Sequence, residues 1–279
     1  MKFVPQYKKY LLLALLTLGT VCSYAGGFPT RPGSLLISPS VNYFFANKQF
    51  DSLGVKKPFP DNGKFNSVYI SLYTEYGISR RFTFVGSLPY VINNYQQDGK
   101  TFASSGLTDM ETGIKYYLAN INYKYYFSLQ ATAITPLYTN PNLGYQEEGA
   151  EFKVAFACSG TMLHRDYYFT LENGIRQYFG DNGPVQDRYT GTFGLTLDKK
   201  SREQIAVSLG GFYTVSNLKK FNAKSNLSKD FSFKQASISY GHSFSKDFTV
   251  FLTGGTFIAG RNTGAGSSAA VSIVYKIGS

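Results

Sequence analysis

The side chains best suited to catalysis are few in this sequence and far apart. Among 279 residues there are two His and two Cys, and the usual spacings of metal-binding or nucleophilic motifs do not occur. His164 and His242 each fall close to the end of a strand-like segment, and no Ser with a paired acid and His stands out. The sequence therefore predicts no enzyme activity, no metal site and no cofactor.

Charged residues offer a different chemistry, because many of them recur inside segments that alternate polar and apolar positions. Both signs occur on what would be one face of each segment. Such side chains either pair with one another or line a polar path and set its electric field. The candidates for this lining are Glu75, Asp109, Glu111, Lys115, Lys124, Glu151, Lys153, Glu172, Arg176 and Arg188.

The elements that would carry these residues are strands. Nearly all of the segments alternate with period two and are rich in Tyr, Phe, Val, Ile and Thr, which is typical of β-structure. The predicted strands are 34–46, 65–77, 82–93, 107–118, 123–137, 149–161, 166–179, 187–198, 203–216, 231–243, 247–259 and 264–277.

Connections of two lengths alternate between these strands. Five are short: 78–81, 119–122, 162–165, 198–202 and 244–246. Six are longer or lie at the other end: 47–64, 94–106, 138–148, 180–186, 217–230 and 260–263. Short turns on one side and longer loops on the other, with an even strand number, indicate a transmembrane antiparallel up-and-down β-barrel of about 12 strands.

The composition fits this all-β class. Aromatic residues make up 17% and charged residues 16% of the chain, and mean hydropathy is −0.17. Only residues 11–22 form a long apolar run, which excludes a bundle of membrane helices. Tyr and Phe gather near strand ends, as in the aromatic girdles of membrane proteins, although aromatic packing across an ordinary sheet gives a similar pattern.

The first 25 residues are typical of a secretory signal peptide. Lys2, Lys8 and Lys9 precede the apolar stretch 11–21, and Ser23 and Ala25 supply small residues for cleavage after Ala25. Residues 26–279 would then form the barrel. Cleavage removes Cys22, so Cys158 has no intrachain partner.

An exported barrel of this kind belongs in a bacterial outer membrane. Its expected partners are outer-membrane lipid, lipopolysaccharide and the assembly machinery. The lysine-rich loops 47–64 and 217–230 could attract lipopolysaccharide phosphates, and solvation of exposed charge is the simpler interpretation. Nucleic acid is not expected as a partner, because the charge is dispersed and no recognition module is present.

Two segments carry a family resemblance. They read YGISRRFTFVGSLPYV at 76–91 and GLTDMETGIKYYL at 106–118. They resemble the outer-membrane barrel family of the meta-pathway of phenol degradation, which is described as transporter-like. The resemblance implies uptake of hydrophobic or aromatic compounds, and it supplies no catalytic residue.

The sequence therefore predicts a passive channel or transporter for small solutes. One alternative is a structural or adhesion barrel with a plugged lumen and functional outer loops. A barrel enzyme is the least favoured alternative. The sequence leaves the solute, the gating and the oligomeric state open.

Overall fold

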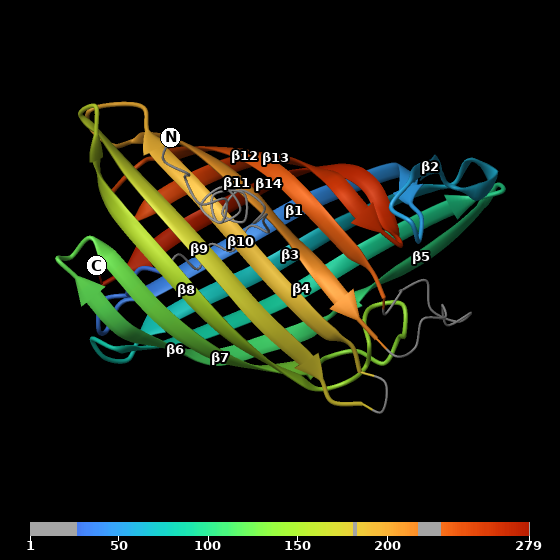
Figure 1. The fold of residues 1–279 in the computed structure, drawn as a ribbon, viewed down its shortest axis with the longest axis horizontal. Helices are drawn as coiled ribbons and strands as arrows, with labels where there is room; N and C mark the ends of the chain where they lie inside the picture. The colour runs from blue at the N-terminus through green and yellow to red at the C-terminus, as the bar shows by residue number, and fades with distance from the viewer. Residues whose placement is uncertain (1–26, 181–182, 217–229, 279) are drawn as a thin grey trace, which may run out of the picture.

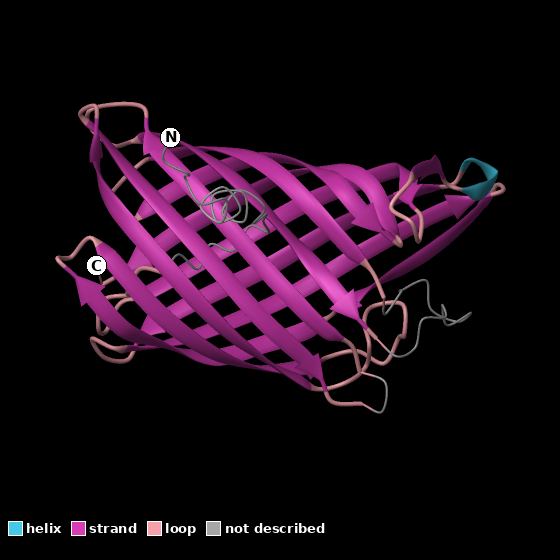
Figure 2. Ribbon diagram, viewed as in Figure 1, coloured by secondary structure: helices cyan, strands magenta, loops and turns pink. Residues whose placement is uncertain are grey.

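The computed structural model describes residues 27–180, 183–216 and 230–278, which form a single twisted, tilted sheet (Figures 1 and 2). The strands are β1 (Leu35–Phe50), β2 (Lys56–Pro58), β3 (Lys64–Gly77), β4 (Phe82–Gln97), β5 (Lys100–Leu107), β6 (Asp109–Ile121), β7 (Tyr125–Pro136), β8 (Gly149–Met162), β9 (Arg165–Tyr178), β10 (Val185–Thr196), β11 (Glu203–Val215), β12 (Ser232–Ser243), β13 (Phe248–Arg261) and β14 (Thr263–Ile277). A 3-10 turn, Pro60–Asn62, follows β2. Among the described residues no helix has the length and apolar character to cross a membrane.

The sheet closes on itself because β1 pairs with β14, its last strand, as well as with β3. Two of the strands add no position to the wall. Among the described residues β2 pairs with β1 alone, so it adds none. β5 and β6, which Thr108 separates, both pair with β4 and together count as one position. The result is a closed antiparallel barrel of twelve wall positions, which confirms the predicted fold class.

The two ends of the barrel differ as predicted. One end, which we call the turn end, has the short connections and the start of β1, and Leu35 pairs there with Ile277. The other end, which we call the loop end, carries β2, β5 and the longer connections (Figure 1). Residues 217–229, in one predicted loop, and the predicted signal peptide lie outside the described residues.

The prediction of a loop at 94–106 is wrong. β4 continues to Gln97 and returns as β5, so the two strands form a hairpin at the loop end. Its turn is Asp98-Gly99, with φ of 50° and 69°. Positive φ at both central residues matches the right-handed twist of paired strands, which explains why this dipeptide extends the sheet.

Alternation along each strand separates two faces. On β7 the buried residues Ser128, Gln130 and Thr132 alternate with apolar residues that include the exposed Phe127. On β11 the buried Ser208 lies between Val207 and Leu209, which are both exposed. Polar residues thus face inward and apolar residues outward, the reverse of a soluble protein and the arrangement expected in lipid.

Candidate functional site

One side of the lumen is covered by a cluster of charged side chains that we call the charged wall. It carries three cations and three anions, all from inward positions of β6, β8, β9 and β10. Its members are Glu111, Glu151, Lys153, Glu172, Arg176 and Arg188.

The buried guanidinium of Arg176 is the centre of the charged wall. Its Nε donates to Glu151 Oε2 at 2.9 Å, and its Nη2 donates to Glu111. Arg188 Nη1 donates to the same oxygen of Glu151 at 2.7 Å. Since Glu151 and Arg176 are cross-strand partners, strand register brings the first pair together. Glu111 lies three strands from Arg176 in the sheet order, and only the curvature of the barrel brings it within reach.

Lys153 completes the charged wall. Its Nζ lies 3.5 Å from Glu172 Oε2 and 3.7 Å from Glu151 Oε1. Gly174 is the cross-strand partner of both Lys153 and Arg188. A Cβ at Gly174 would lie 3.3 Å from Glu151 Oε1, so this glycine leaves the space that the Glu151 carboxylate fills.

Tyrosines lie on the loop-end side of the charged wall. Asp109 accepts hydrogen bonds from the hydroxyls of Tyr138 and Tyr178, each at 2.9 Å. The ring of Tyr145 packs edge-on against Tyr178, with 4.9 Å between centroids. Burial raises the pKa of Tyr138 and Tyr145, both in the loop after β7, so these phenols stay neutral and can donate.

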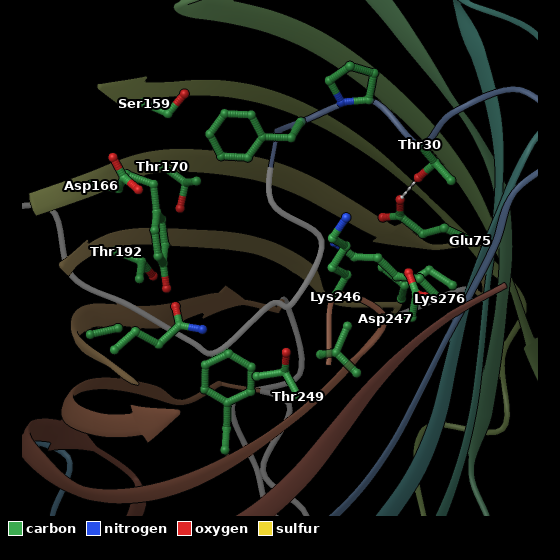
Figure 3. A pocket seen from close by; sticks show the side chains of 18 of the residues that line it. Thr30, Glu75, Ser159, Asp166, Thr170, Thr192, Lys246, Asp247, Thr249 and Lys276 are labelled. Carbon is green, nitrogen blue, oxygen red and sulfur yellow. Dashed lines mark hydrogen bonds between the residues drawn. The ribbon is translucent and has the colours of Figure 1, made fainter. Parts of the chain in front are cut away.

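A second, smaller charged cluster lies near the turn end. Glu75 and Lys115 are both buried and form an ion pair of 2.5 Å between Oε1 and Nζ. Tyr73 OH donates to the same oxygen at 2.6 Å, and Thr30 Oγ1 donates to Oε2 at 2.5 Å (Figure 3). Glu75 therefore has three donors, one of them from the chain that precedes β1.

The segment 27–34, which precedes β1, lies inside the turn end. The amide of Gly33 donates to the carbonyl of Gly77 at 2.7 Å, and the hydroxyl of Tyr117 donates to the carbonyl of Phe28. A Cβ at Gly77 would come 2.1 Å from the carbonyl oxygen of Arg31. Only a glycine at this position lets the segment approach the wall so closely.

Beside this segment is a chamber of about 710 Å³ (Figure 3). Its wall is rich in hydroxyl groups, including those of Thr170, Thr192 and Thr249, and Phe28 and Thr30 of the N-terminal segment also line it. Lys246, Asp247 and Lys276 also line it and lie close together in Figure 3. The chamber can hold a small solute among hydroxyl groups and a few charged side chains.

The opposite side of the lumen is aromatic, and we call it the aromatic wall: Phe44, Phe212, Phe233 and Phe257. Phe233 stacks on Phe257 with 4.2 Å between ring centroids and 6° between planes. Phe44 and Phe212 extend the row, each 5.0 Å from its neighbour. The Arg188 guanidinium lies 4.7 Å from the Phe212 ring, so it joins the two walls.

Sequence reasoning missed the aromatic wall, although strand parity could have found it. Phe212 is an even number of residues from Ser208 along β11, and Phe257 is an even number from Thr253 along β13, so the members of each pair point to the same face. These aromatic residues thus share the inward face with polar residues. The gathering of Tyr and Phe near strand ends predicts aromatic girdles, and it predicts no aromatic side of the lumen.

The structure brings nine of the ten predicted lining residues into the wall of the lumen. Lys124 is the exception, because it lies exposed in the turn between β6 and β7, with Nζ 5.4 Å from the Tyr125 ring centroid. His164 is exposed in the turn between β8 and β9. Among the described residues no group of three His, Cys, Asp or Glu is arranged to hold a metal ion.

The closed barrel with polar residues inside and apolar residues outside is the architecture of outer-membrane channels. In structure the chain is similar to the COG4313 outer membrane channel from Pseudomonas putida F1, with a TM-score of 0.70, 11% identity, and coverage of 92% of this chain and 100% of that one. The NanC porin gives a TM-score of 0.51, 10% identity, and coverage of 85% and 100%.

The β-domain of the Bordetella autotransporter BrkA also gives 0.51, with 12% identity and coverage of 86% and 99%. At such identities the likeness is one of fold. No family model matches the sequence, and no curated protein matches it either.

Proposed function

We propose that this chain is a bacterial outer-membrane channel for the passive passage of small solutes. The observation that carries the proposal is the lumen itself, which has two chemically different walls and a chamber of about 710 Å³ at one end. The similar folds of an outer membrane channel and a porin support it. The export signal in residues 1–25, insertion by the assembly machinery and contact with lipopolysaccharide are parts of the same proposal.

We further propose that the solutes have an aromatic or apolar part, as the resemblance to the phenol-degradation family implies. The aromatic wall supports this, because its rings offer faces and edges on which a planar or apolar group can pack. The charged wall contributes neutralised ion pairs rather than one dominant sign. A solute would therefore meet a narrow polar surface on one side and an apolar surface on the other.

Recording current across planar bilayers tests both parts. The full-length purified protein should conduct potassium chloride, and 4-hydroxybenzoate should reduce that current more than an aliphatic carboxylate of similar size. The double variant Phe233→Ala, Phe257→Ala should lose this difference. The matched control is Phe152→Ala, because Phe152 is 54% exposed on the outward face. Absence of conductance would reject the channel, and equal block by both solutes would reject the aromatic preference.

A second candidate is the structural barrel with a plugged lumen. It is favoured by the segment 27–34 inside the turn end and by the buried ion pairs of the charged wall. In that case the intact protein would leave conductance at the level of the bare bilayer, and only removal of residues 27–33 would open the lumen. A channel narrowed by this segment would conduct more after the same deletion.

A further inference from the structure

The outward face of the barrel is not uniform, because it carries a groove across β11, β12, β13, β14 and β1. The groove measures about 660 Å³. Gly254 and Ala269 form its floor, and they are cross-strand partners. A Cβ at Gly254 would meet no atom within 4 Å, so the space above this glycine is open.

Larger apolar side chains border the groove. Ile238, Leu252 and Tyr43 are 53%, 55% and 47% exposed, and each lines it. They project beside the small residues of the floor, so the surface is hollowed here rather than flat. Its lining is almost wholly apolar, which suits an acyl chain and excludes a polar headgroup from this depth.

Toward the turn end the groove reaches a polar cluster. Tyr240 lines the groove, and its hydroxyl donates to Glu203 Oε2. His242 Nδ1 lies 2.6 Å from Glu203 Oε1. Strand register places the cluster on the same outward face, because Ile205 pairs with Tyr240 and Glu203 pairs with His242. The cluster therefore begins where the groove ends.

The position of this cluster matches the level of lipid headgroups. The side chains of Glu203 and His242 are 29% and 37% exposed. A carboxylate facing lipid is tolerated near the interface and costly deeper in the membrane. Phe244 packs edge-on against His242 and lies 5.6 Å from Phe248 between ring centroids, and such rings favour the interface.

The polar cluster can accept further hydrogen bonds, so it favours a ligand that carries N–H donors. Glu203 uses one acceptor site on each oxygen for Tyr240 and His242, and a carboxylate has about four such sites. Further acceptor capacity is left on both oxygens, and the group carries a formal negative charge. A primary ammonium group has three N–H donors and the complementary charge, whereas a quaternary ammonium group has no N–H to donate.

We propose that the groove and the Tyr240–Glu203–His242 cluster bind one phospholipid with a primary amine in its headgroup. One acyl chain lies over Gly254 and Ala269, and the ammonium group donates to Glu203. The site is on the outside of the barrel and is independent of any solute passing through the lumen. It requires only that the barrel lies in a membrane.

Native mass spectrometry of the full chain tests the proposal. The protein is released from detergent after incubation with equal amounts of phosphatidylethanolamine, phosphatidylcholine and phosphatidylglycerol that share the same acyl chains. We expect one phosphatidylethanolamine to be retained roughly tenfold more often than phosphatidylcholine, as one charge-assisted hydrogen bond predicts. Glu203→Gln should abolish that preference. Gly254→Leu, which fills the groove, should reduce retention of all three lipids.

Two control variants keep the result interpretable. Glu148→Gln removes an exposed acid in the loop after β7, and Ala133→Leu enlarges an outward small residue on β7. Both should behave as the unmodified protein does. Equal retention of the three lipids, a preference for phosphatidylglycerol, or a preference that survives Glu203→Gln would overturn the proposal. A dimer that Gly254→Leu disrupts would assign the groove to a second copy and overturn it as well.

Discussion

The two walls of the lumen fill the space inside the barrel with different side chains, ion pairs on one side and stacked rings on the other. The charged wall holds three cations and three anions, with Arg176 between two carboxylates and an N–O distance of 2.9 Å to one of them. The aromatic wall holds four phenylalanines in a row, with centroid separations from 4.2 to 5.0 Å. Charge pairs depend on every partner being present, whereas stacked rings lose only the contacts of the ring removed. The walls should therefore respond unequally to single substitutions.

The largest effect is expected from Arg176→Met in the charged wall. The substitution leaves Glu151 and Glu111 without their central cation, and breaking a buried pair costs about 3 kcal/mol or more. Urea unfolding in lipid vesicles, followed by circular dichroism, measures the loss. Lys124→Met removes an exposed turn cation and should change stability by less than about 0.5 kcal/mol. Equal effects of the two substitutions would remove the distinction between paired and solvated charge.

A smaller loss is expected from Phe233→Ala in the aromatic wall. Phe233 contacts Phe257, Phe212 and Phe231, and aromatic pairs contribute about 0.5 to 1.5 kcal/mol each beyond area, with weaker contributions for the more distant rings. We expect about 2 kcal/mol in the same unfolding experiment, because no charge is left unpaired. Conductance should rise, since the lumen widens at this level. A loss larger than that of Arg176→Met would reverse the ranking of the walls.

The stability of the Glu75–Lys115 cluster near the turn end should change still less when one partner is lost. Thr30→Val removes one of three donors to Glu75, while Lys115 and Tyr73 remain at 2.5 and 2.6 Å. We expect the docking of the N-terminal segment to weaken by about 1 kcal/mol. Hydrogen exchange at the Gly33 amide should accelerate about fivefold accordingly. Unchanged exchange would mean that backbone contacts alone hold the segment.

The smallest effect concerns Asp198, a carboxylate outside both walls. Its Oδ1 accepts from the amides of Glu203 and Arg202 at 2.9 and 2.8 Å, and these bonds lower its pKa from 3.8. A lowered folded-state pKa stabilises the turn above pH 3.8, and the gain disappears as the pH falls through the lowered value. The melting points of the protein and of Asp198→Asn should therefore converge in acid. A constant difference would contradict this.

Much of the fold was predictable from the sequence, and particular residues show why. Alternation of period two fixed which residues share a face, so nine of ten lining candidates lie in the lumen wall. Lys124 departs because Asn122 and Tyr123 take positive φ, which ends β6 and starts a turn. The hairpin at Asp98-Gly99 was also readable, since this dipeptide is a strong turn signal, but the polar composition of residues 94–106 favoured a loop.

What the tertiary structure alone decided is which of these residues meet. Side-chain parity is a local property of the strand, set by backbone geometry, and the sequence therefore determined the strand number, the two ends and the inward and outward sets. The approach of Arg176 to Glu111, the row of phenylalanines and the entry of residues 27–34 depend on how far the sheet curves before it closes. Curvature and register are shared by twelve strands at once, and no single segment encodes them.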